Sequence, residues 1–108
     1  MMMPRRRRRR RGSRGRMPTP VYIGERPVAE AFLPQPAAGG EPPIVLEPEE
    51  LEALRLVDLE GLSQEEAGGR MGVSRGTVWR LLHQAREKVA RALTEGRRLV
   101  ISTGAESG

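Results

Sequence analysis

The sequence contains no cysteine, and its only histidine is His83. The lack of cysteine excludes a disulfide framework and a thiolate metal site, and one histidine cannot form a cluster of metal ligands or a relay. We therefore expect neither a metal nor a cofactor, and the sequence offers little from which an enzyme active site could be built.

Long apolar runs are absent as well. No stretch approaches the roughly 20 apolar residues that span a membrane, and the N-terminus lacks the apolar core of a signal peptide. The sequence therefore predicts a cytoplasmic protein without a membrane partner. The aromatic residues are Tyr22, Phe32 and Trp79, too few for the stacking platforms of a single-stranded RNA-binding protein.

The charges divide the chain into blocks. The net charge is +5, and the first 20 residues contain nine arginines and no acid, so the remaining 88 residues carry −4. Residues 25–66 carry −9, whereas residues 70–98 carry +6. A basic block of this kind is typical of a protein that turns one face towards a polyanion; the alternative is that its arginines merely cover a solvated helix.

The composition predicts four segments. Residues 1–20 form a disordered Arg-rich arm, because seven consecutive arginines repel one another. Residues 21–43 form a linker rich in proline and glycine, residues 44–101 form the folded domain, and residues 102–108 form a disordered tail. A domain of about 60 residues folds alone only marginally, so we expect help from a second chain or from nucleic acid.

The first helix of the domain is expected to begin at Pro48 and to end before Gly61. Glu47 precedes it and is a weaker cap than serine or threonine. The apolar stripe of this helix consists of Leu51, Leu54, Leu56, Val57 and Leu59.

Two further helices follow. Ser63 and Glu66 have the spacing of a capping box at the start of the second helix. Gly72 supplies a turn, and Ser74 caps a third helix that runs from Arg75 to about Thr94. The apolar positions of the third helix are Val78, Leu81, Leu82, Ala85, Val89, Ala92 and Leu93.

Two short β-prone runs flank the helices, at residues 44–46 and 99–101. They could pair as a small ribbon, remain loose, or pair with a second subunit. The predicted fold class is therefore mainly α, with three helices and a short β-ribbon.

The second and third helices, joined by a turn that contains Gly72, have the pattern of a helix-turn-helix. In such a unit the first helix braces the second, whose exposed N-terminal face enters the major groove of DNA. Arginine can donate to guanine edges or to phosphates there. The candidate DNA-contacting residues are Ser74, Arg75, Gly76, Thr77, Trp79, Arg80 and His83. Arg86, Lys88 and Arg91 lie further along, where they would touch phosphates at best.

Gly68 and Gly69 are adjacent within the second helix, where each weakens the helix by about 0.8–1 kcal/mol relative to alanine. We expect Gly68 to pack closely against the third helix. Gly69 should face outward, where it has no packing role.

The stretch EALRLVDLEGLSQEEAGGRMGVSRGTVWRLLHQAREKVARAL resembles the fourth region of sigma factors. It resembles more closely a small prokaryotic family of uncharacterised, predicted DNA-binding proteins built on that domain, over about residues 42–101. The resemblance implies a helix-turn-helix fold but no target site. The cysteines common in that family are absent, and Trp79 stands where a polar residue is usual. The ring of Trp79 could contact a thymine methyl or a sugar, or pack against Phe32 or Tyr22.

The function expected from the sequence is specific binding of double-stranded DNA by a transcriptional regulator that works as a dimer. The alternative is a protein-interaction module that docks on RNA polymerase or an anti-sigma-like partner. The feature that would serve it is the acidic start of the first helix, with Glu47, Glu49, Glu50 and Glu52.

The arm generates a first prediction. It either binds phosphates or reflects a start codon assigned too early, with Met3 or Met17 as the true first residue. If it binds phosphates, deletion of residues 1–16 lowers affinity for all duplexes alike and flattens the dependence of affinity on salt concentration. Fluorescence anisotropy over a salt series measures this slope, and an unchanged slope would show that the arm is idle.

Overall fold

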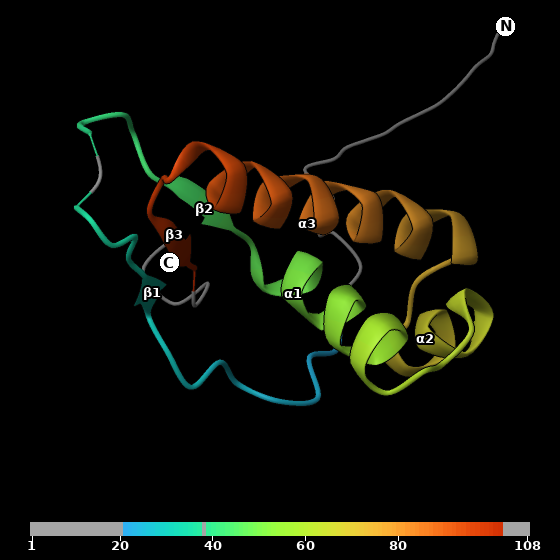
Figure 1. Ribbon diagram of the computed structural model, residues 1–108. Helices are drawn as coiled ribbons and strands as arrows, with labels where there is room; N and C mark the ends of the chain where they lie inside the picture. Colours follow the sequence, from blue (N-terminus) through green and yellow to red (C-terminus); the bar gives the residue numbers. More distant parts are fainter. Residues whose placement is uncertain (1–20, 38, 103–108) are drawn as a thin grey trace, which may run out of the picture.

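A long helix, α3 (Arg75–Glu95), spans the domain, and the other elements pack along it (Figure 1). This computed structural model describes residues 21–37 and 39–102. The arm and nearly all of the tail lie outside the described residues. The remaining elements are β1 (Ala31–Phe32), β2 (Ile44–Leu46), α1 (Pro48–Leu54), η1 (Arg55–Leu59), α2 (Gln64–Met71) and β3 (Leu99–Ile101).

The first predicted helix consists of two parts, the α-helical α1 and the π-helical η1. Glu50 compensates for the weak cap, because its carboxylate accepts a hydrogen bond of 2.9 Å from the backbone N–H of Glu47. In η1 the hydrogen bonds span five residues, as from the N–H of Glu60 to the carbonyl of Arg55 (2.9 Å). Gly61 follows with a φ of 79°.

The ends of α2 and α3 lie where the sequence predicts them. Ser63 and Glu66 exchange hydrogen bonds of 2.9 and 3.0 Å, which confirms the capping box. Gly72 has a φ of 74°, a left-handed conformation that glycine adopts without strain. Ser74 Oγ accepts the N–H of Thr77 at 3.1 Å and so caps α3, which ends before Gly96.

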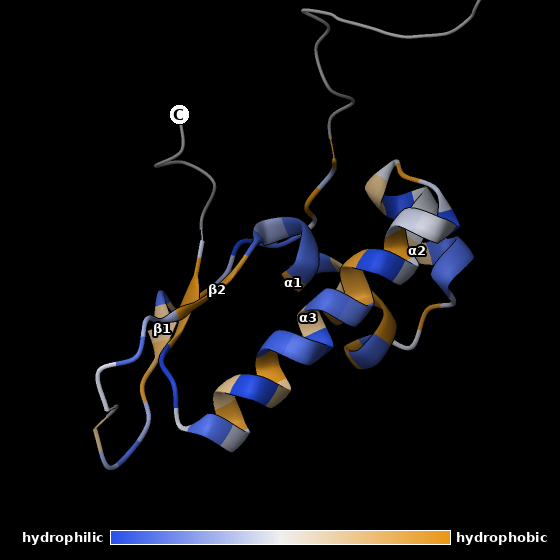
Figure 2. Cartoon of the chain, turned by 90° about the horizontal axis from the view of Figure 1, so that it is seen from above, coloured by the Kyte–Doolittle hydropathy of each residue, from blue (hydrophilic) through white to orange (hydrophobic). Residues whose placement is uncertain are grey.

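The core lies between α3 and the first three helical segments. The residues buried there are Ala53, Leu56, Ala67, Met71, Val78, Leu81 and Leu82, and a second cluster joins Leu46 of β2 and Ile101 of β3 to Ala85 of α3. Along α3, hydrophobic and hydrophilic positions alternate as expected for one buried face (Figure 2). Not every apolar position of the helices is buried, since Leu59 at the end of η1 and Leu93 near the end of α3 are each 79% exposed.

The strands form one sheet in the order β1-β3-β2. The predicted pairing of residues 44–46 with 99–101 is confirmed, with β2 parallel to β3. β1 adds an antiparallel strand on the other side of β3, with Ala31 opposite Val100. β1 lies within residues 21–43, which were expected to be a linker, so part of that segment belongs to the domain. Within the described part of the chain, no helix is long and apolar enough to cross a membrane.

Gly68 lies at the closest approach between α2 and the turn into α3. A Cβ at Gly68 would stand 2.7 Å from the carbonyl oxygen of Val73, whereas a Cβ at Gly69 would meet nothing within 4 Å. The structure thus agrees with a packing role for Gly68 and with an outward position for Gly69.

These two glycines form a matched pair for a test of stability. We expect Gly69→Ala to raise the free energy of unfolding by about 0.5–1 kcal/mol, because alanine favours the helix and meets no obstacle. Gly68→Ala should lower it by about 1–3 kcal/mol, because the backbone at Val73 must move. Urea unfolding followed by circular dichroism measures both, and equal effects would contradict the close packing.

Candidate nucleic-acid interface

The seven residues predicted to contact DNA lie together at the N-terminal end of α3. Ser74, Arg75, Gly76, Trp79, Arg80 and His83 are exposed, and Thr77 is half-buried. Consecutive helical turns bring them together, while Val78, Leu81 and Leu82 anchor the opposite side of the helix in the core. This segment therefore presents polar and aromatic side chains on a firmly held helix.

The first turn of α3 is organised by its cap. Ser74 Oγ accepts the N–H of Thr77 and lies 3.0 Å from Thr77 Oγ1. The first N–H groups of any helix lack partners within that helix and favour negative charge nearby. Ser74 satisfies one of them, so its main effect is to hold the turn from which Arg75 and Gly76 project.

Trp79 and His83 form a small stack one turn apart. Their ring centroids are 4.0 Å apart with an interplanar angle of 29°, and His83 Nδ1 lies 2.9 Å from the carbonyl oxygen of Trp79. The predicted packing of Trp79 on Phe32 was wrong, because Phe32 lies beside Val89 and Leu93 at the other end of α3. Among the described residues, no ring contact joins Trp79 to Tyr22 either.

The basic residues of the second half of α3 are paired with acids of the chain itself. Arg86 donates to Asp58 at 3.0 and 2.7 Å, and this contact holds the pKa of Asp58 below its ordinary value. Lys88 lies 2.7 Å from the carboxylate of Glu50.

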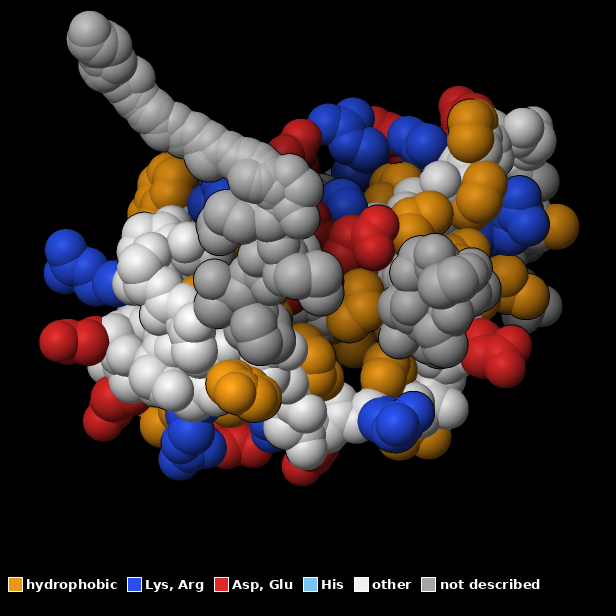
Figure 3. All heavy atoms as spheres, turned by 180° about the vertical axis from the view of Figure 1, so that it is seen from behind, with side chains coloured by type: hydrophobic (Ala, Val, Ile, Leu, Met, Phe, Trp, Pro, Cys, Tyr) orange, Lys and Arg blue, Asp and Glu red, His pale blue; other side chains and the backbone are white. Residues whose placement is uncertain are grey.

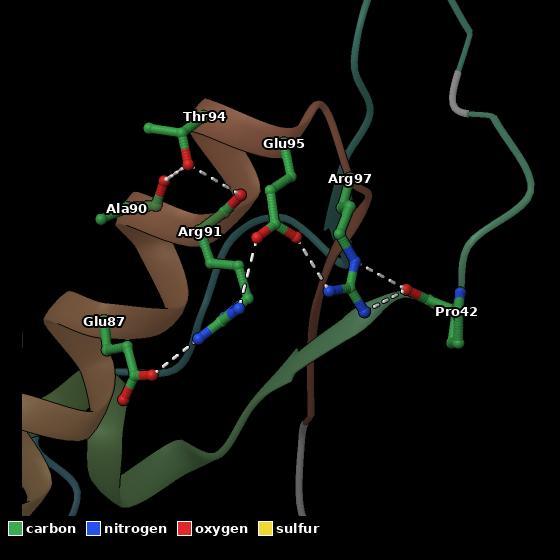
Figure 4. Close-up of polar contacts among 7 residues, drawn as sticks. All are labelled: Pro42, Glu87, Ala90, Arg91, Thr94, Glu95 and Arg97. Carbon is green, nitrogen blue, oxygen red and sulfur yellow. Dashed lines mark hydrogen bonds and ion pairs between the residues drawn. The ribbon is translucent and has the colours of Figure 1, made fainter.

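Arg91, on the next turns of α3, bridges Glu87 and Glu95 at 2.9 and 3.2 Å (Figure 4). The three cations expected to touch phosphates at best are therefore neutralised within the domain.

Arg75 and Arg80 differ from these cations. Neither guanidinium makes an ion pair or a hydrogen bond to any residue in the described ranges 21–37 and 39–102, although both are exposed. On the face seen in Figure 3, by contrast, acidic and basic side chains are interspersed with hydrophobic ones. The unpaired positive charge of α3 is thus concentrated at its N-terminal end.

The acids at the start of the first helix are largely committed to internal contacts. Glu50 and Glu52 are 4% and 3% exposed. Burial alone would raise the pKa of Glu52, but hydrogen bonds from Arg55 and from the N–H of Gly24 outweigh it, so this pKa lies below its ordinary value. Arg55 also contacts Glu60 at 2.6 Å. Glu52, through the N–H of Gly24, and Arg55, through Glu25, join residues 24–25 to the helices.

Long-range pairs of this kind carried no signal in the sequence, because Asp58 and Arg86 are 28 residues apart and Glu50 and Lys88 are 38 apart. The contact between Trp79 and His83 could have been found, because residues four apart on a helix are neighbours. In the residues that the structure describes, no group of three or more His, Cys, Asp or Glu side chains is placed to hold a metal ion.

The domain is a small helical unit with a short mixed sheet and an exposed, uncompensated helix start. The chain belongs to the family described as "Protein of unknown function DUF134", which it matches over residues 3–107. It is 59% identical over 81 residues to UPF0251 protein PYRAB12660 of Pyrococcus abyssi, an alignment that covers 73% of this chain and 74% of the relative. No solved structure matches.

Two other relatives extend the comparison. UPF0251 protein PF0620 of Pyrococcus furiosus is 56% identical over 93 residues, which cover 84% of this chain and 83% of the relative. A UPF0251 protein of Archaeoglobus fulgidus is 45% identical over 93 residues, covering 86% and 88%.

The pairing of Glu52 predicts a pH dependence of stability. A carboxyl group with a lowered pKa in the folded state contributes stability above its unfolded pKa and loses that contribution as the pH falls through the folded pKa. We expect Glu52→Gln to be less stable at neutral pH by on the order of 1–3 kcal/mol, because Arg55 loses the buried carboxylate that accepts two of its hydrogen bonds.

Glu52→Gln should also lose less stability than the wild type between about pH 5 and pH 3. Urea unfolding at several pH values measures this difference. Glu65→Gln, which removes an exposed acid in the first turn of α2, is the control. Parallel acid profiles of wild type and Glu52→Gln would contradict the assignment.

Proposed function

We propose that this protein binds double-stranded DNA in a sequence-specific manner and acts as a transcriptional regulator. In this proposal α2 and α3 work as a helix-turn-helix, and the N-terminal end of α3 (residues 74–83, the recognition end) enters the major groove. The observation that carries the proposal is the contrast between unpaired Arg75 and Arg80 and the paired cations Arg86, Lys88 and Arg91.

This contrast favours a polyanion as the partner of the recognition end. An exposed guanidinium without a carboxylate partner can bind the O6 and N7 atoms of guanine, or a phosphate, without first breaking an internal ion pair. Arg75 and Arg80 are also anchored, because the helix that bears them is buried at Val78, Leu81 and Leu82. An anchored helix limits the loss of conformational freedom on binding.

The alternative, docking on RNA polymerase or an anti-sigma-like partner through acids of the first helix, has less support. Glu50 and Glu52 are buried in internal contacts. Glu47 and Glu49 are therefore the acids of that set that are left to meet a partner.

Replacement of the two unpaired arginines tests the proposal. Arg75→Ala and Arg80→Ala should each weaken binding to the preferred duplex by about 1–3 kcal/mol, because each removes a contact to a base edge or phosphate. The double variant should lose its preference among sequences while it retains the helical circular dichroism spectrum. Selection from a random duplex library, followed by anisotropy titration of the enriched motif, provides both measurements.

Arg91→Ala is the matched control. It removes the same charge from the same helix, but its guanidinium is held by Glu87 and Glu95, so the enriched motif should not change. A random library that yields no enriched motif with the wild-type chain would refute specific DNA binding. If Arg91→Ala weakened binding as much as Arg75→Ala, net charge alone would account for the interaction with DNA.

A further inference from the structure

Three large hydrophobic side chains are exposed together beside the C-terminal end of α3. Phe32 and the adjacent Leu33 are 61% and 71% exposed, and Leu93 of α3 is 79% exposed. They line a groove of about 310 Å³. The rest of its lining consists of Pro34, Val89, Ala92, Arg97 and Leu99. We call this surface the apolar end.

The apolar end offers almost nothing to a polar ligand. Arg97 is the charged residue of its lining, and its guanidinium is already engaged (Figure 4). Nε and Nη2 donate to the carbonyl of Pro42 at 3.2 and 2.8 Å, and Nη1 lies 3.1 Å from Glu95. The surface therefore matches an apolar protein surface better than a charged molecule.

The two outer edges of the sheet, on β2 and on β1, differ in the contacts that they make. The outer edge of β2 is contacted by α3, because Lys88 Nζ donates to the carbonyl of Val45 at 2.7 Å. A lysine in this position hinders another strand from pairing there. Within the described part of the chain, β1 pairs with β3 on one side and with no strand on the other; Ala31 and Phe32 are exposed, and Phe32 belongs to the apolar end. The open edge and the hydrophobic surface coincide.

We propose that the apolar end is the interface through which a second copy of this chain docks across a two-fold axis. In this dimer Phe32, Leu33 and Leu93 pack against the same side chains of the other copy. A two-fold interface requires a surface that complements itself, and a surface with hydrophobic side chains around a groove whose charged residue, Arg97, is already paired with Glu95 does so without opposing unpaired like charges. The small size of the domain adds a reason to bury this surface.

The position of the apolar end along α3 also fits a second copy. This step rests on the proposed function. α3 runs from α2 at one end to the sheet at the other (Figure 2). At a rise of about 1.5 Å per residue, the centre of the recognition end lies about 19 Å along the axis from the mean position of Val89, Ala92 and Leu93, the α3 residues of the apolar end. Two antiparallel copies of α3 that meet there would separate their recognition ends by about 38 Å, close to the roughly 34–36 Å between successive half-sites on one side of DNA.

Sedimentation equilibrium of the full chain without DNA tests the interface. We expect the wild type to dimerise and Leu93→Lys to weaken the dimer at least about tenfold, because two buried ammonium groups would oppose each other. Leu59→Lys is the matched control, since Leu59 is exposed to the same 79% but lies at the end of η1, outside the apolar end. Phe32→Ser changes the same surface at a residue of β1 and should weaken the dimer as well.

Folding is checked by circular dichroism, and lysine suits the last turns of a helix. A wild-type chain that remains monomeric at every concentration would overturn the inference. A dimer that both Leu93→Lys and Phe32→Ser leave intact would overturn it too, because the interface would lie elsewhere.

Binding to duplexes with two copies of the selected motif separates this inference from the proposed function. The wild type should prefer motifs spaced by one helical turn over motifs spaced by one and a half turns, and Leu93→Lys should lose that preference. A dimer that binds no duplex would refute the proposed function and leave the interface standing. Specific DNA binding by a chain that never dimerises would refute the interface and leave the proposed function standing.

Discussion

Ion pairs between the first helical segments and α3 help to determine which basic side chains of α3 remain without a partner. Asp58 pairs with Arg86, and Glu50 pairs with Lys88. In each case the acid comes from α1 or η1 and the cation from α3. The acidic and basic blocks, which follow one another along the sequence, are therefore packed face to face. The acidic block acts as counter-charge for the distal half of α3, and Arg75 and Arg80 lie beyond its reach.

The contribution of these ion pairs to the stability of the fold differs with their burial. The Arg86–Asp58 pair is half-exposed, and exposed pairs contribute at most about 1 kcal/mol. Glu52 is almost fully buried, so the loss of Arg55 would leave a desolvated carboxylate without its cation, with the N–H of Gly24 as a remaining donor. The surface pairs thus shape the electrostatics of the domain, whereas the buried pair ties segments together.

Local signals in the sequence predicted the helices well, because the chemistry of their ends is local. Ser63 with Glu66, Gly72 and Ser74 each act through neighbours within four residues, and the structure places each where that chemistry requires. The two-residue strand β1 could not be predicted, because its partner β3 lies more than 60 residues away and Pro and Gly surround it. The exposure of Leu93 escaped prediction because periodicity shows which side of a helix is apolar, but not where the neighbouring elements end.

The grouping of the candidate site at one helix end was likewise predictable, because its members lie on three consecutive turns. The lack of partners for Arg75 and Arg80 was not, since it depends on where distant acids lie.

The recognition end is supported by α2, the part of the domain with the weakest sequence pattern. α2 has eight residues and contains Gly68 and Gly69, and helices shorter than about 12–15 residues are marginal alone. Its C-terminal end is held from outside, because the N–H of Tyr22 donates to the carbonyl of Met71 at 3.0 Å and Val21 packs against the core. A few residues after the Arg-rich arm therefore stabilise the helix that supports α3. Loss of residues 21–24 would weaken the recognition end without removing any side chain from it.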